Sequence, residues 1–118
     1  MRTLAIISAL FAWSLPLHAM SVSCAFNMEC IEGETCNETV FSVSVPENTD
    51  QPDALILQTD AETLRGSGYQ LDGLLHLVFT AESALHVISA SADQAARYTV
   101  HMQGPMAITY QGTCEVLN

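Results

Sequence analysis

Four cysteines are the residues of this chain whose type and spacing point most directly to a chemistry. They are Cys24, Cys30, Cys36 and Cys114. Zinc sites use gaps of about two to four residues between paired cysteines, whereas five residues separate neighbours among the first three cysteines here. The chain also has no Cys-x-x-Cys motif of the kind that redox proteins use. We therefore expect the four thiols to form two structural disulfides in an oxidising compartment.

The pairing of these cysteines depends on geometry, because four cysteines allow several connectivities and the sequence alone leaves the choice open. If the segments on either side of the first loop pair as a hairpin, Cys30 lies opposite Cys36 and Cys24 lies opposite Ser42. That register favours a Cys30–Cys36 disulfide. Cys24 is then left for Cys114, in a bridge that ties the first strand of the domain to the last.

Three histidines, His76, His86 and His101, form a second candidate site. If the chain makes one tight turn between each neighbouring pair, all three side chains share a face of a sheet. Imidazoles gathered in this way bind copper or zinc, and Met102 and Met106 would add soft ligands for Cu(I). Each histidine also fits an ordinary half-exposed strand position, so the sequence requires no metal and no other cofactor.

An acidic cluster surrounds the second and third cysteines. It comprises Glu29, Glu32, Glu34 and Glu38. A calcium site is one interpretation, but the segment lacks the regular aspartate and asparagine spacing of a calcium-binding loop, and we expect a solvated loop instead. The triplet Asn37-Glu38-Thr39 matches a glycosylation acceptor, which matters only in a secretory pathway that glycosylates.

Motifs of catalysis are absent from the sequence. There is no G-x-S-x-G elbow, no H-E-x-x-H zinc motif and no glycine-rich phosphate loop. A domain of this size also has limited room for a catalytic cleft together with the residues that must support it. We therefore expect a protein that is not an enzyme, with a hydrolase of an unrecognised type as an alternative.

The first nineteen residues have the pattern of a secretory signal peptide. Met1 and Arg2 give a cationic start, an apolar run covers 4–17, and the small Ala19 stands where a signal peptidase would cut. The apolar run is too short to cross a bilayer, which takes about 20 residues. We predict that residues 1–19 are cleaved and that 20–118 form one secreted or periplasmic domain without a stable membrane anchor.

Charge narrows the choice of partners. After removal of the predicted signal peptide, two arginines remain against thirteen acidic residues, a formal net charge of −11 with histidine neutral, and the chain has no lysine. Nucleic acids are excluded, because binding to phosphate needs clustered lysine and arginine, and anionic lipid surfaces are disfavoured for the same reason. A basic protein partner is permitted, since opposite charges steer encounter. The acidity also serves solubility by itself, and the oligomeric state stays open.

The rest of the sequence predicts an all-β domain. Short segments rich in β-forming residues alternate with polar turns at intervals typical of a small antiparallel sandwich or barrel, here of about seven to eight strands. The segments are 22–27, 40–45, 54–57, 63–69, 74–80, 84–90, 96–102 and 106–116. The segment 54–57 also fits one buried helical turn, and a helix over 81–96 is a competing interpretation.

Two local signals place turns and close contacts within this pattern. Asp72-Gly73 is a strong hairpin signal, because a type I′ turn needs positive φ at both central residues. Gly66 and Gly68 lie two residues apart in an expected strand, where glycine marks a bend, a bulge or the close approach of another backbone.

In its size, export signal, disulfides and acidic β-rich body, the chain is similar in kind to bacterial periplasmic lysozyme inhibitors of the small-barrel type. Those proteins carry a Ser-Gly-x-x-Tyr stretch on a strand, which Ser67-Gly68-Tyr69 matches in part, with the tyrosine directly after the glycine. The resemblance implies an inhibitor-like role towards a basic protein. We therefore expect a non-catalytic binding or structural module that engages a basic protein, with a metal-binding protein that uses the three histidines as the alternative.

Overall fold

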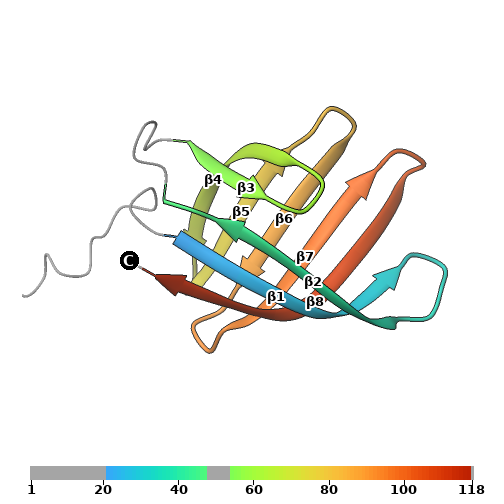
Figure 1. Cartoon of the computed structure of the whole chain (residues 1–118), viewed down its shortest axis with the longest axis horizontal. Coiled ribbons are helices and arrows are strands. Elements are labelled where there is room, and N and C mark those ends of the chain that lie inside the picture. Colours follow the sequence, from blue (N-terminus) through green and yellow to red (C-terminus); the bar gives the residue numbers. More distant parts are fainter. Residues whose placement is uncertain (1–20, 48–53, 118) are drawn as a thin grey trace, which may run out of the picture.

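Eight antiparallel strands, each hydrogen-bonded to its neighbours in chain order, close into a barrel in the computed structural model (Figure 1). The structure describes residues 21–47 and 54–117, and the predicted signal peptide lies outside them. The strands are β1 Ser21–Ile31, β2 Asn37–Val45, β3 Leu55–Gln58, β4 Thr63–Leu71, β5 Leu74–Thr80, β6 Ala84–Ala90, β7 Ala95–Met102 and β8 Met106–Leu117. The predicted all-β fold is confirmed, and of the two expected architectures the chain adopts the barrel.

Alternation of apolar and polar residues decides which side chains fill the barrel. On β5, Leu75, Leu77 and Phe79 are buried, and the residues between them are partly exposed. This period of two turns one face of every strand towards a common core. The competing helix over 81–96 is not formed, because its residues 84–90 belong to β6, where Val87 and Ile88 favour the pleated conformation.

The glycine signals correspond to a tight turn and a close backbone contact. Asp72 and Gly73 both have positive φ, 51° and 81°, and join β4 to β5 as predicted. At Gly66 a built Cβ would overlap the carbonyl oxygen of Val78 and the ring of Phe79. Glycine at this position lets β4 and the aromatic ring on β5 approach one another closely.

Both disulfides that the hairpin geometry favoured are present, Cys24–Cys114 and Cys30–Cys36. The predicted register opposite Cys24 is wrong by one residue, because Cys24 pairs with Val43 and not with Ser42. The cause is an irregularity in the hairpin, which shifts the pairing of β1 with β2 between Phe26 and Met28. Such bulges sharpen the local bend and twist of a sheet.

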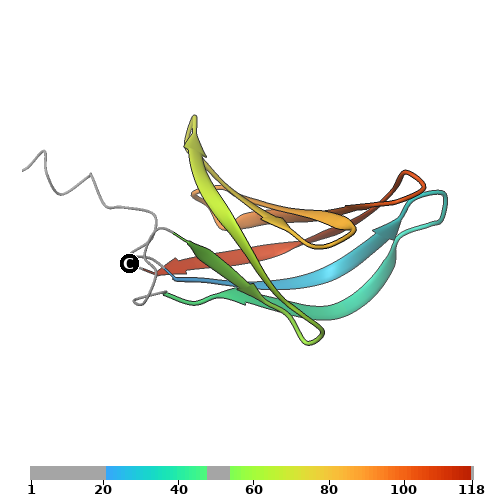
Figure 2. The ribbon, with the colours of Figure 1, turned by 90° about the horizontal axis from the view of Figure 1, so that it is seen from above.

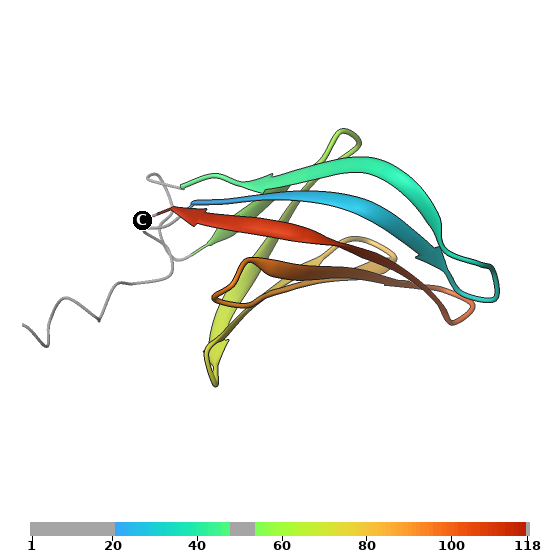
Figure 3. The same cartoon turned by 90° about the horizontal axis from the view of Figure 1, so that it is seen from below.

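The two ends of the barrel differ in shape. One end, here called the hairpin end, carries the turns β1–β2, β3–β4, β5–β6 and β7–β8, and the opposite, terminal end carries Ser21 and Leu117. Figures 2 and 3 show that the β1–β2 and β7–β8 hairpins reach beyond the other two at the hairpin end. In the described ranges, no helix is long and apolar enough to span a membrane.

Closure of the barrel is uneven around its circumference. β1 and β8 pair along almost their whole length, from Ser21–Leu117 to Ile31–Ile108. β2 and β3 meet through the single pair Ser44–Gln58. The β2–β3 seam is therefore the weakest junction of the barrel.

Candidate interaction site

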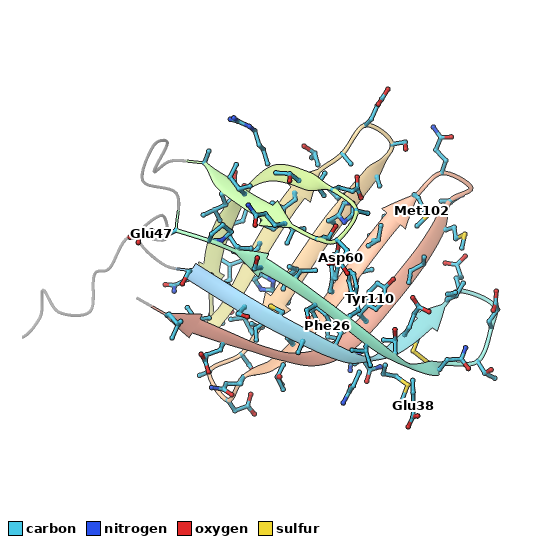
Figure 4. All side chains as sticks on the ribbon, in the orientation of Figure 1. Phe26, Glu38, Glu47, Asp60, Met102 and Tyr110 are labelled. Carbon is cyan, nitrogen blue, oxygen red and sulfur yellow. A yellow bond between two sulfur atoms is a disulfide. The ribbon has the colours of Figure 1, made fainter. Side chains whose placement is uncertain are left out.

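Acidic side chains are concentrated at the hairpin end. Against a single arginine, Arg65 near the start of β4, seven of the thirteen acidic residues lie in the turns of this end or in the strand ends next to them. They are Glu29, Glu32, Glu34, Glu38, Asp60, Glu62 and Glu82. Figure 4 shows Glu38 near the β1–β2 hairpin and Asp60 on the β3–β4 turn, with Glu47 at the other end of the molecule. The hairpin end thus presents a focused negative potential to solvent.

Four aromatic side chains pack together inside the barrel towards this end. Phe26 and Tyr98 are buried, and Phe41 and Tyr110 are half-buried. The closest rings are those of Phe41 and Tyr110, with centroids 4.8 Å apart, and Tyr98 stacks on Tyr110 at 5.5 Å. Phe41 and Tyr110 therefore offer aromatic surface to solvent at the rim of the acidic end.

Glu29 and Tyr110 join the acidic and the aromatic groups. They are direct partners in the β1–β8 ladder, so both side chains lie on the same face. Burial, a hydrogen bond to Glu29 and the charge of its carboxylate together raise the pKa of Tyr110 to about 12. The hydroxyl thus stays protonated and donates to the carboxylate over the physiological pH range.

His86 is the one buried polar side chain of the described core, with 4% of its surface exposed. Its Nδ1 lies 2.6 Å from the Tyr98 hydroxyl, with which it forms a hydrogen bond, and its Nε2 has no partner. Burial lowers the pKa of His86, and the charge of Glu62 opposes this effect in part. The histidine is therefore held neutral in the core.

This arrangement predicts a pH-dependent stability. Because the folded state lowers the pKa of His86, the unfolded chain binds its proton more readily. Stability should therefore fall as the pH drops below about 6.5, until the lowered pKa of the folded state is reached. We expect a His86→Gln variant to lose this component of the slope and a His76→Gln variant to keep it. Urea unfolding at several pH values between 7.5 and 4.5 measures both, and equal slopes in all three proteins would contradict the prediction.

The predicted histidine cluster does not form. In the β5–β6 ladder His76 pairs with Ser89 and Phe79 pairs with His86, so His76 and His86 lie on opposite faces of the sheet. His76 hydrogen-bonds Ser89 Oγ at 2.8 Å, and His101 is exposed on the outer face. The prediction assumed a β5–β6 turn centred on a single residue, Glu82, which would put His76 and His86 on one face. The turn is instead centred between Glu82 and Ser83, and this reverses the face of one histidine. Among the residues with described positions, no group of three or more histidine, cysteine, aspartate or glutamate side chains could hold a metal ion.

The remaining sequence signals lie at separate places on the surface. Asn37 is exposed at the start of β2, and its amide donates to the Thr35 carbonyl oxygen at 3.4 Å. The stretch Ser67-Gly68-Tyr69 lies within β4, where Tyr69 is 53% exposed. It faces solvent on the wall of the barrel and not at the acidic end.

A polar hollow marks the place where the β2–β3 seam opens. Its volume is about 310 Å³, and its lining includes Ser42 and Ser44 of β2 and Gln58, Thr59 and Asp60 of β3 and the following turn. Hydroxyl, amide and carboxylate groups converge here from both sides of the seam. These groups suit hydrogen bonds to a polar chain.

A larger hollow, of about 520 Å³, lies at the terminal end between the β4–β5 and β6–β7 turns. Leu74 and Val116 give it an apolar rim, and Asp72 is the one charged residue among its described lining. It lies at the opposite end of the barrel from the acidic cluster.

No protein-family model, no curated protein and no solved structure matches this chain. The site therefore has to be interpreted from its own chemistry. Sequence reasoning found the acidic cluster of the first hairpin, but not that Asp60 and Glu62 lie at the same end of the barrel, nor the aromatic rim. Only the alternating pattern of Phe41 and Tyr110 signalled that these rings face the same interior.

Proposed function

We propose that this protein is a non-catalytic binding module that engages a basic protein partner in an oxidising compartment outside the cytoplasm. The observation that carries the proposal is the gathering of seven acidic residues at one end of the barrel, against the single arginine Arg65 there. The two disulfides are compatible with an exported protein. Secretion or residence in the periplasm, after removal of the predicted signal peptide, is part of the proposal.

The chemistry of the rim supports a cationic partner. Half-buried Phe41 and Tyr110 expose aromatic surface beside the Glu29 carboxylate. A lysine or arginine side chain gains both from the face of an aromatic ring and from a neighbouring carboxylate. Surface charges of this kind mainly raise the rate of association and select the partner by its sign.

The resemblance to small-barrel lysozyme inhibitors gives this function its most specific form, an inhibitor-like action towards a basic enzyme. The eight-stranded barrel supports that form at the level of fold, although fold alone does not establish activity. A lysozyme, as a strongly basic protein, is therefore the first probe for binding.

Two variants with the same change of charge test the proposal. One neutralises four residues at the hairpin end: Glu32→Gln, Glu34→Gln, Asp60→Asn and Glu62→Gln. The matched control neutralises four residues towards the terminal end: Glu47→Gln, Asp72→Asn, Asp93→Asn and Glu115→Gln. Titration calorimetry against a panel of basic proteins, lysozyme included, at low and high salt measures the affinity of each. We expect the first variant to lose on the order of tenfold in affinity, at a few tenths of a kcal/mol per charge, and the control to lose much less.

The salt dependence of binding and the position of the neutralised charges test separate parts of the proposal. Binding to a basic protein that weakens with salt and depends on the hairpin-end charges supports the proposal. Absence of salt-dependent binding to every basic protein in the panel would refute it. Equal losses in the two variants would show that net charge alone, and not the hairpin end, attracts the partner.

A further inference from the structure

One edge of β2 is open along most of its length. Of the nine residues of β2, only Ser44 pairs with β3, through Gln58, while the other side of β2 is paired with β1. Residues 37–43 therefore have a strand on one side only, within the described part of the chain. Figure 4 shows the β2 ribbon crossing in front of the barrel with its neighbour β3 ending well before the β1–β2 hairpin.

The register identifies which backbone groups face this open edge. The Cα atoms of Cys24 and Cys114 are 4.0 Å apart, which marks a non-hydrogen-bonded pair of the β1–β8 ladder. The N–H and C=O of Cys24 therefore point to β2, and those of its partner Val43 point back to β1. Since the direction alternates along a strand, the N–H and C=O groups of Ser42 point away from β1, to the open side. Beyond the bulge, the Cα atoms of Cys30 and Cys36 are 4.2 Å apart, which marks another non-hydrogen-bonded position, and alternation from Cys36 places the groups of Glu38 and Val40 on the open side as well.

An edge of this kind is a template for another strand. Seven residues of extended chain span about 23 Å, enough to pair with a short peptide segment. Natural proteins commonly block such edges with lysine, proline or a covering loop. Here the residue in the middle of the edge is a valine, Val40, and it is 99% exposed. The side chain of Val40 thus leaves the edge sterically open. The polar hollow beside Ser42 and Ser44 continues the same line towards the seam.

Charge selects the occupant of the edge. Glu38 lies on the edge strand itself, and Asp60 lies across the seam beside the hollow. A second copy of this chain would bring its own acidic edge against this one, and like charges facing each other destabilise strand pairing. A segment with basic residues meets opposite charges instead.

We propose that the open edge of β2, residues 38–43, binds an extended basic segment of a protein partner by strand addition. This proposal rests on the proposed function and names the site at which the basic partner would bind. Main-chain hydrogen bonds to Val40 and Ser42 would supply affinity, and the carboxylates on either side would select a cationic sequence.

A pair of peptides separates strand addition from simple attraction of charge. The probe is a nine-residue peptide with lysine at alternate positions and threonine or valine between them, capped at both ends and labelled for fluorescence anisotropy. The control has the same sequence with an N-methyl group at every residue, so that it keeps the charge but neither of its edges can complete the ladder. We expect the disulfide-bonded protein to bind the probe at least tenfold more tightly than the N-methylated control.

Variants at Val40 test the edge itself. Val40→Pro removes the N–H that the register places on the open side, and proline is tolerated on such an edge; it should weaken peptide binding at least tenfold. Val40→Thr, which keeps the N–H, should bind within about twofold of the parent. Val40→Lys keeps the backbone intact and places a cation on the edge, so a loss of binding there supports the proposal even if Val40→Pro fails to fold. Hydrogen exchange should slow at the amides of Val40 and Ser42 when the peptide binds.

The outcomes distinguish this inference from the proposed function. Equal binding of the two peptides, or unchanged binding by Val40→Pro in a folded protein, would overturn strand addition while basic proteins still bind at the hairpin end. Dimers of the free protein that Val40→Pro dissociates would make a second copy the occupant and overturn the basic segment. If neither the peptides nor any basic protein binds, the proposed function fails as well.

Discussion

Replacing Cys24 and Cys114 together by alanine should lower the free energy of unfolding by about 4–5 kcal/mol. This disulfide joins residues 90 positions apart, so its loss frees almost the whole described chain in the unfolded state. Small domains have about 5–15 kcal/mol of stability in total, so the variant should be close to unfolding at room temperature. Urea denaturation followed by circular dichroism measures the change.

The matched control is the alanine pair at Cys30 and Cys36. Their bridge closes a loop between residues six positions apart, for which the chain-entropy treatment gives about 2 kcal/mol. Cys30 is half-buried and Cys36 is exposed, whereas Cys24 and Cys114 are buried in the core. Similar losses from the two variants would contradict the view that the long bridge holds the barrel closed.

The alternating pattern made most of this barrel predictable from sequence. Leu75, Leu77 and Phe79 share one face because a strand repeats every two residues, whatever strand lies beside it. Asp72-Gly73 identified its turn because few residue pairs accept positive φ at both positions. Each of these features depends only on residues that are close in the sequence.

Properties that depend on register between strands were harder to predict. The position opposite Cys24 moved by one residue because of a bulge that no motif announces. A shift of one residue in pairing reverses the face of a side chain. The β5–β6 turn differs from the expected one by such a shift, and His76 and His86 therefore lie on opposite faces of the sheet. The candidate site depends on the same kind of information. Tyr110 meets Glu29 through pairing of the first and last strands, which no local pattern encodes.

The open edge and the aromatic rim have a common structural origin. β1, β2 and β8 continue beyond the point where β3 ends, and the bulge near Phe26 bends this extension. The extension leaves β2 without an outer neighbour, and the half-buried rings of Phe41 and Tyr110 pack against each other on it. The same lengthening therefore provides both the backbone edge and the rings that we assign to binding.

Phe79→Ala should lower the free energy of unfolding by about 3–5 kcal/mol, the range for removal of a buried aromatic side chain. Phe79 is 0% exposed and pairs with Gly66 on β4 and His86 on β6. No other residue at position 66 could accept its ring so closely. Phe79→Leu keeps much of the apolar volume and should cost less, about 1–2 kcal/mol. Urea unfolding of the three proteins at pH 7.5 measures both losses.

The same variant should change the pH dependence of stability. Burial lowers the pKa of His86, and Phe79 is its direct partner across the β5–β6 ladder. A cavity in place of the ring would admit water beside the imidazole and bring its pKa back towards the ordinary value. The decrease in the free energy of unfolding below about pH 6.5, which the parent shows, should then be smaller in Phe79→Ala than in Phe79→Leu. NMR titration of the His86 ring in both variants measures this directly, and an unchanged His86 pKa in Phe79→Ala would show that other side chains keep the imidazole dry.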